Sequence, residues 1–409
     1  MNADLGSSGP SPCGSAAPAQ EQVVPHQSLR SLFLRFLRFG FLAWGGPVAQ
    51  IAMIQRELVD EQRWVTRERF RQALAVYQVL PGPEAHEMCV WLGMLARGRL
   101  GALLAGLGFM LPGFVLMLTL GWLYTSGALD VAKLQPVFAG LQAAVVAVIL
   151  RALVRIGGHS WHDRWLLGVG IAAAAATMLG VHFAFVLAAG GLWRVAQNAR
   201  RWPLAGLVVL LLVGCVVNAA LAAETLPVTT SVVGAPPSVL DLFLSGLRAG
   251  MLTFGGAYTV IPFLQQDAVV AGGWLSNAQF LDGVALAGVL PAPLVIFATF
   301  VGQVAGGLPG ALAMTAGVFL PAFSFTLLGH GLFERITGNR TLHGFLDGVT
   351  AAVVGLMAAT TLALVRAGIA GPWHAALAAV ALAVLWRWKA RAAIPAVVLL
   401  GGVCGLALA

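Results

Sequence analysis

Charged side chains are scarce in this chain of 409 residues, and their scarcity excludes a soluble fold. They make up 10% of the sequence, whereas a soluble domain carries about 25%. Hydrophobic residues make up 59%, and four long stretches are nearly free of charge: 136–150, 165–192, 203–222 and 345–365. The composition therefore predicts an all-α integral membrane protein that crosses the lipid bilayer several times.

Cysteine and the common catalytic motifs are also lacking. The four thiols show neither a CxxC spacing nor a Cys/His ligand pattern, so we expect no metal and no cofactor. The chain has no phosphate-binding loop, which argues against ATP-driven transport. It also lacks the HExxH motif, the GxSxG elbow and a paired intramembrane aspartate couple, which argues against a membrane-embedded enzyme.

The net charge of +8 lies in short basic clusters between apolar runs rather than in a soluble basic domain. Such clusters are typical of cytoplasmic loops, so we assign no nucleic-acid partner. Nothing in the sequence fixes the oligomeric state, and a homodimer stays open.

What the chain does contain is an internal repeat. Residues 38–83 and 248–293 align without a gap at an offset of 210, with 15 of 46 positions identical. Both segments carry an arginine, a Gly-Gly pair seven residues later and a Pro-x-Pro motif. A duplicated apolar chain with helix-breaking motifs is typical of secondary transporters. We divide it into an N-terminal tail, two transporter repeats and a linker between them: 1–28, 29–222, 239–409 and 223–238.

Basic residues alternate between the halves. The stretch 54–72 contains five arginines, whereas 264–282 contains no lysine or arginine. Arg97 and Arg99 match Gly307 and Pro309 at the same offset. By the positive-inside rule, this alternation predicts two halves that are inverted in the membrane.

Basic clusters also flank the breaks of the first half on both sides, so both ends of each broken helix are expected on the cytoplasmic side. We therefore predict re-entrant or broken helices in each half, and about 10–13 membrane segments in all. Ordinary spans with kinks are the alternative.

The helix that follows each break is expected to bind an anion. Pro47 follows Gly45-Gly46 and Pro83 follows Pro81-Gly82, and proline favours the first helical position. The free N–H groups of such a helix start attract an anion. Close helix packing is the alternative role of Gly-Gly. The predicted substrate-binding residues are Arg38, Gly45, Gly46, Pro47, Gln78, Pro81, Gly82, Pro83, Arg248, Gly255, Gly256, Pro291, Ala292 and Pro293.

Arg38 and Arg248 belong to this set because an arginine inside an apolar segment is a functional candidate. Its planar fork suits tetrahedral oxyanions. The alternative is that both side chains extend toward lipid headgroups.

Glu84 makes the site asymmetric, since the second half has Leu294 at that position. We predict it as a candidate for proton coupling. The alternative is a carboxylate that only stabilises a helix start.

These motifs resemble those of the chromate ion transporter (CHR) superfamily in its long form with two homologous halves. The resemblance covers residues 29–408 and rests on Phe39-Gly40, Trp44-Gly45-Gly46-Pro47, Gln78, Pro81-Gly82-Pro83-Glu84-Ala85, Phe254-Gly255-Gly256, Pro291-Ala292-Pro293 and Leu320-Pro321-Ala322-Phe323. It implies export of chromate across the bacterial cytoplasmic (inner) membrane, chromate resistance, and sulfate as the chemical analogue. His86 and Ala292 depart from the family pattern, so the preferred oxyanion stays open.

Uptake of sulfate or another oxyanion is a rival in the same class, because sequence does not set direction. A membrane-embedded enzyme and a channel are the rivals from other classes. An inside-negative potential favours export of a dianion, since two charges crossing 100 mV gain about 4.6 kcal/mol.

Overall fold

The computed structural model describes residues 27–78, 80–128, 130, 133–158, 163–225, 236–254, 256–328, 340–388, 390 and 392–407. Almost all of the expected tail, and Gly255, lie outside them. The described residues form helices and short connections, which confirms the predicted all-α class. Four helices are long and apolar enough to cross a membrane: Glu84–Thr125, Gln135–Gly157, Leu294–Leu328 and Thr341–Gly368.

The first half contains α1 (Leu29–Phe41), α2 (Pro47–Ile54), the π-helical η1 (Gln55–Glu61), α3 (Arg67–Tyr77), α4 (Glu84–Thr125), α5 (Gln135–Gly157), α6 (Arg164–Met178), α7 (Phe183–Asn198) and α8 (Trp202–Thr225). The second half contains α9 (Val239–Met251), η2 (Ala257–Thr259), α10 (Val260–Gln265), the π-helical η3 (Gln266–Ala271), α11 (Asn277–Val289), η4 (Leu294–Ile296), α12 (Phe297–Leu328), α14 (Arg340–Gly368), α15 (Pro372–Arg387) and α16 (Ala393–Ala407).

The same capping residues start equivalent helices in the two halves. Ser28 caps α1 and Ser238 caps α9, each by accepting from the N–H three residues later. Thr66 and Ser276 do the same for α3 and α11. Side-chain oxygens at this position satisfy an N–H that has no partner inside the helix. The repeat therefore fixes local structure as well as composition.

Several helices are too short to cross a bilayer. α1, α9 and α11 have 13 residues each, which gives about 20 Å at 1.5 Å per residue. The hydrocarbon core is about 30 Å thick. Helices of this length, joined in pairs through the Gly-Gly and Pro-x-Pro breaks, have the dimensions expected for re-entrant hairpins.

α4 and α12 each fold back on themselves. The backbone leaves helical geometry at Arg97 and Gly98 in α4, and at Gly306 and Gly307 in α12. Arg97 therefore corresponds to Gly306 rather than to the Gly307 that the ungapped alignment predicts. The second half is one residue shorter here and begins with the 3-10 turn η4. The charge comparison is unaffected, because both glycines are neutral.

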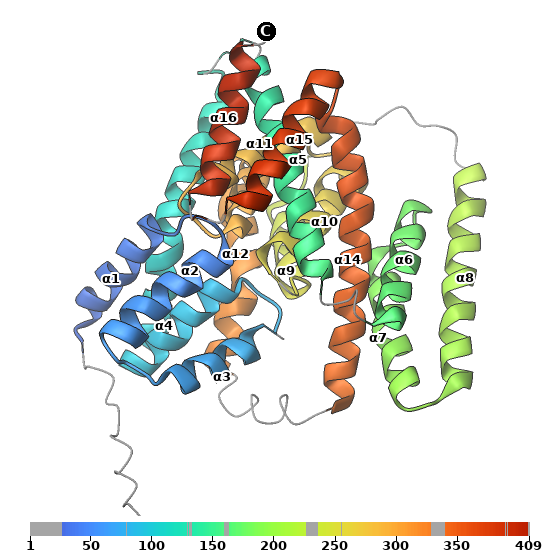
Figure 1. Cartoon of the computed structure of the whole chain (residues 1–409), viewed down its shortest axis with the longest axis horizontal. Helices are drawn as coiled ribbons and strands as arrows, with labels where there is room; N and C mark the ends of the chain where they lie inside the picture. Colours follow the sequence, from blue (N-terminus) through green and yellow to red (C-terminus); the bar gives the residue numbers. More distant parts are fainter. Residues whose placement is uncertain are drawn as a thin grey trace, which may run out of the picture.

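The two halves run in opposite directions (Figure 1). α4 ends near the top of the view, where α5 begins and descends, whereas α12 ends near the bottom, where α14 begins and rises. α3 lies toward the lower end and its counterpart α11 toward the upper end. This antiparallel arrangement is the one that inverted repeats require.

Two helices of each half pack on the other half. α6 and α7 pack against α14, whereas α15 and α16 pack against α5. Paired glycines allow both contacts, since a Cβ at Gly140 would lie 2.1 Å from the Gly401 carbonyl oxygen. At the equivalent place, a Cβ at Gly348 would lie 2.2 Å from the Gly190 carbonyl oxygen. Small residues let membrane helices approach this closely.

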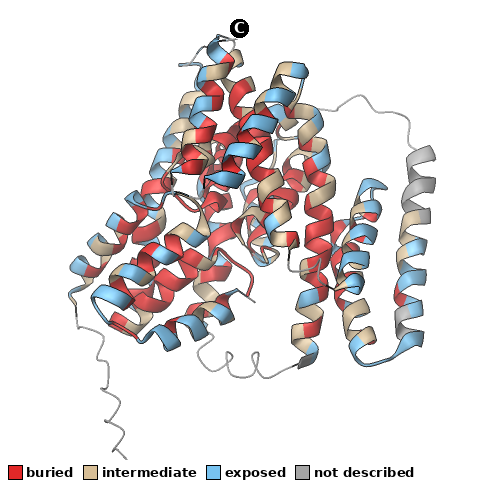
Figure 2. Ribbon diagram, in the orientation of Figure 1, coloured by how far each residue is buried: buried red, intermediate tan, exposed pale blue. Residues whose placement is uncertain are grey.

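The outer surface is apolar, as a lipid-facing surface must be. Figure 2 shows buried residues gathered on the inner helices and exposed ones on the outer faces of α6 and α8. Exposed leucines recur every three or four positions along α4: Leu100, Leu103, Leu107 and Leu111. A continuous apolar stripe of this kind would be unfavourable in water. It supports a multi-pass membrane protein.

Candidate functional site

The four helix breaks are tied to one another across the two halves. The Gly82 N–H donates to the Thr253 carbonyl at 2.9 Å, joining the first Pro-x-Pro loop to the second Gly-Gly break. At the equivalent junction, the buried side chain of Gln50 bridges two carbonyls. Its Nε2 donates to Ala43 at 2.9 Å and to Ala292 at 3.1 Å. The breaks therefore form one central constellation.

The first Gly-Gly pair owes its composition to backbone geometry. Gly45 and Gly46 have φ values of 89° and 82°, which favour glycine. The position of a Cβ on Gly46 is 3.9 Å from the Tyr258 hydroxyl, an ordinary contact, so tight packing does not explain this glycine. Pro47 occupies the start of α2, and no side chain among the described residues caps that helix. The start of α2 thus faces the second half with unused N–H capacity.

The Pro-x-Pro loops interlock with the long helices of the opposite half. Gly82 lies against Ala322 of α12, whereas Ala292 lies against Gly113 of α4. All three residues of each motif, 81–83 and 291–293, are buried. Gly82 has a φ of 148°, again in the region that favours glycine. The two loops are therefore equivalent parts of a symmetric junction.

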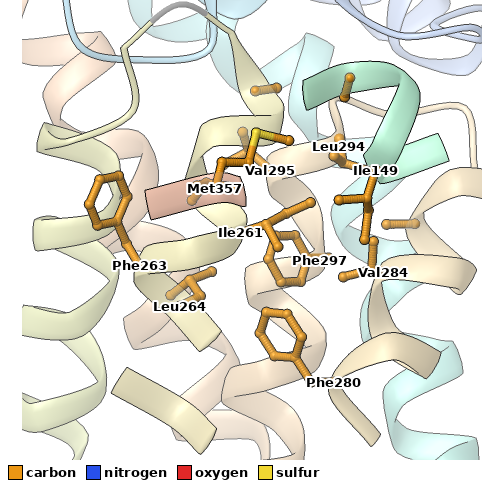
Figure 3. Packing of buried hydrophobic residues seen from close by; sticks show 14 of the residues in the cluster. Ile149, Ile261, Phe263, Leu264, Phe280, Val284, Leu294, Val295, Phe297 and Met357 are labelled. Carbon is orange, nitrogen blue, oxygen red and sulfur yellow. The ribbon is translucent and has the colours of Figure 1, made fainter. Parts of the chain in front are cut away.

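The second half lacks charged groups at the corresponding helix starts. Ala257 opens a 3-10 turn before α10 instead of an α-helix, in keeping with the missing proline there. After the second Pro-x-Pro motif, Leu294 and Val295 are buried in an apolar cluster. Figure 3 shows them packed near Ile149, Ile261 and Met357. Apolar side chains therefore fill the space beside the second Pro-x-Pro motif.

Two arginines that we did not predict supply positive charge to the centre. Arg151 and Arg155 lie one turn apart on α5, and both act electrostatically on the Tyr258 hydroxyl. Arg155 also acts on the carboxylate of Glu84. The sequence feature that could have revealed these arginines is their spacing: they stand at positions i and i+4 near the end of an apolar span. The repeat comparison missed them because it covered residues 38–83 and 248–293, and α5 lies outside both ranges.

Glu84 and Gln78 flank the first Pro-x-Pro loop. Glu84 opens α4, is partly exposed and faces Arg155. Gln78 ends α3 with an exposed side chain. Both residues are therefore accessible beside the loop, whereas the loop itself is buried.

Arg38 and Arg248 form ion pairs within their own hairpins. Arg38 contacts Glu57 of η1, and Arg248 contacts Asp267 of η3 at 3.0 Å. Glu57 and Asp267 are themselves equivalent at the offset of 210, so the ion pair is part of the repeat. This pairing gives both arginines a structural reason to recur. Their predicted contact with an anion stays a prediction.

The arrangement is suited to binding a small oxyanion. A helix start without a cap and a tyrosine hydroxyl meet between the halves, and two guanidinium groups of α5 act on that hydroxyl electrostatically. Each of these groups favours negative charge. Among the described residues no group of three or more His, Cys, Asp or Glu side chains could hold a metal ion.

The chain is similar to known proteins along most of its length. A family described as "Chromate transporter" matches residues 30–195 and 240–406. The "Chromate transport protein" of Pseudomonas aeruginosa is 53% identical over 390 residues, covering 94% of each chain. That of Cupriavidus metallidurans is 32% identical and covers 93% of each chain. No solved structure matches the chain.

Proposed function

The chain belongs to the chromate transporter family, and from that premise we propose that it exports chromate from the bacterial cytoplasm as a secondary transporter of the cytoplasmic membrane. The central constellation between the halves is the proposed binding site. Export of this kind confers chromate resistance. Sulfate has the same tetrahedral shape and charge as chromate, so it is the expected competitor for the site.

One observation carries the proposal: the four breaks meet at a junction between two antiparallel halves, and the cations of α5 act electrostatically on the Tyr258 hydroxyl at that junction. Secondary transporters bind their substrates at the interface of inverted repeats, where broken helices present their ends. A site at such an interface can open to either side when one half moves against the other.

The source of energy follows from the charge of the substrate. Chromate is a dianion at neutral pH, so an inside-negative potential of 100 mV favours its exit by about 4.6 kcal/mol. The sequence contains no phosphate-binding loop, in agreement with transport without ATP. Membrane potential is therefore sufficient as the driving force for export.

Vesicle flux of labelled chromate tests the proposal directly. Inverted and right-side-out vesicles should both show net movement of chromate from the cytoplasmic face to the outer face. A potential that is negative on the cytoplasmic face should accelerate this movement in both. The flux should saturate, because a carrier must bind each ion, whereas a channel would not saturate. Competition with sulfate, molybdate and phosphate ranks the oxyanions. Net movement of sulfate toward the cytoplasm, with no chromate export, would replace export by uptake.

A further inference from the structure

Glu87 is a fully buried carboxyl group that the proposed binding of chromate does not use. Its exposed fraction is 0%, and neither of its oxygens has a hydrogen-bond partner among the residues that the structure describes. It lies on the first turn of α4, where its backbone N–H donates to the Pro83 carbonyl. The side chain turns back onto the Pro-x-Pro loop, since a Cβ on Gly82 would lie 2.7 Å from Oε1.

Among the residues that the structure describes, no counter-charge acts on Glu87. The charged group that acts on it is Glu84, one turn earlier on α4, and that residue faces Arg155. From α3 the titratable neighbour is Tyr77, whose hydroxyl pairs with Thr326 of α12 at 3.1 Å. On the other side of α4, His86 packs against the rings of two phenylalanines of α12, Phe319 and Phe323.

A carboxylate in this position would be unfavourable, because burial removes its hydration and nothing replaces it. A neutral carboxylic acid avoids that cost. A proton, rather than a metal cation, is the ion that neutralises this carboxylate. A metal needs several oxygen ligands, and the described residues contain no such cluster. The geometry thus favours Glu87 over the more accessible Glu84 as the proton-binding group.

We propose that Glu87 binds the proton that moves with the anion, and that the Pro-Gly-Pro loop links the two. This inference rests on the proposed transport function. Gly82 contacts Glu87 on one side, and its N–H ties the loop to Thr253 of the second half. A dianion beside this loop is repelled by an ionised Glu87 and tolerated by a neutral one. The proton is taken up by a Glu87 oxygen on the side where chromate binds, and it is released to water on the side where chromate leaves. One net negative charge then crosses with each chromate, so the membrane potential still favours export, by half as much as for the dianion alone.

The protonation of Glu87 can be measured without any substrate. Infrared spectra of the full-length protein in lipid at neutral pH should contain the carbonyl band of a protonated carboxylic acid. The spectrum of wild type minus Glu87→Gln should show this band, and that of wild type minus Glu84→Gln should not. Absence of the band from the Glu87 difference spectrum would overturn the proposal, whatever the protein transports.

The coupling is tested by two chromate fluxes in proteoliposomes. One is driven by a pH gradient, acid on the chromate side, with the potential held at zero, and the other by a potential without a pH gradient. Glu87→Gln should lower the first flux at least tenfold and leave the second within about threefold. Glu87→Asp, which keeps an ionisable group, should retain both fluxes.

Equal loss of both fluxes in Glu87→Gln and Glu87→Asp would assign Glu87 a purely structural role, and equal retention would show that it carries no proton. If the wild-type protein moves no chromate, the proposed function fails, while the infrared result still decides whether Glu87 is protonated.

Discussion

The two halves share a backbone and differ in charge. Helix caps, glycine breaks, π-helical turns and interlocked loops recur in both, down to the contact between a Pro-x-Pro loop and the long helix of the opposite half. The charged groups at the centre come from the first half alone: Glu84, Glu87, Arg151 and Arg155.

Where the first half has these charges, the second has hydrocarbon. η4 packs Leu294 and Val295 into the apolar core, and α14 carries Ala359 and Ala363 where α5 carries its arginines. The α14 positions follow from the equivalent glycine contacts at Gly140 and Gly348. In the proposed mechanism, the duplicated backbone supplies alternating access, whereas the charges that recognise the substrate come from the first half.

The largest expected effect concerns the orientation of the halves. In a cysteine-free background, a cysteine at Glu68 should react with an impermeant reagent only from the cytoplasm, and one at Ala278 only from outside. These positions are equivalent at the offset of 210, and both are exposed. Labelling of both from one side would refute the inverted arrangement.

Bulk at the first Pro-x-Pro loop should abolish transport, whereas the same loop of the second half should tolerate change. Gly82→Leu forces a side chain against Glu87 and Ala322 at a φ that only glycine favours, so we expect no measurable chromate flux. The matched variant Ala292→Gly removes one methyl group and should retain flux within a few-fold. Size-exclusion profiles check that both proteins are folded. Normal flux in Gly82→Leu would remove this loop from the pathway.

Removal of the Arg155 guanidinium should weaken chromate binding about tenfold to a hundredfold. A charge-assisted hydrogen bond contributes about 1.5–3 kcal/mol, and 1.4 kcal/mol corresponds to a factor of ten. Arg155→Lys should lie between wild type and Arg155→Gln, since it keeps the charge and loses the fork. The counterpart Ala363→Gln serves as the control. Half-saturation of flux reports the change, and an unaltered value in Arg155→Gln would exclude this residue from the site.

The smallest effects are expected at the two hairpin ion pairs, and they should be unequal. Arg248→Gln leaves the carboxylate of Asp267, which is 8% exposed, with Ser245 as its partner, and should cost about 1–3 kcal/mol of stability. Arg38→Gln should cost less than about 1 kcal/mol, because Glu57 is more exposed and keeps Arg35 at 3.7 Å. Thermal unfolding in detergent measures both. A loss of chromate affinity without a loss of stability would instead place these arginines on the anion path.

Much of this fold follows from the sequence because the repeat marks it. Positions that must keep a special backbone geometry, such as Gly46 and Gly82, stand beside prolines and recur at a fixed offset. The apolar stretch 165–192 noted in the sequence forms two short helices, α6 and α7.

The parts that the sequence could not reveal depend on long-range contacts. The packing of α15 and α16 on α5 relies on glycines such as Gly140 and Gly401. A small residue in an apolar helix does not indicate which helix it contacts. Arg151 and Arg155 were missed for a different reason. The repeated motifs lie within residues 38–83 and 248–293, and α5 lies outside both ranges.

The packing of α15 and α16 on α5 also has a consequence for synthesis of the protein. α5 packs mainly against α15 and α16, which are synthesised long after it, so Gly140 stays without its partner until a residue 261 positions later has been made. During that interval its small-residue face is uncovered in the lipid, where membrane chaperones and proteases can reach it. Deletion of α16 is therefore expected to expose the first half to degradation, although synthesis of the first half is complete before α16 is made.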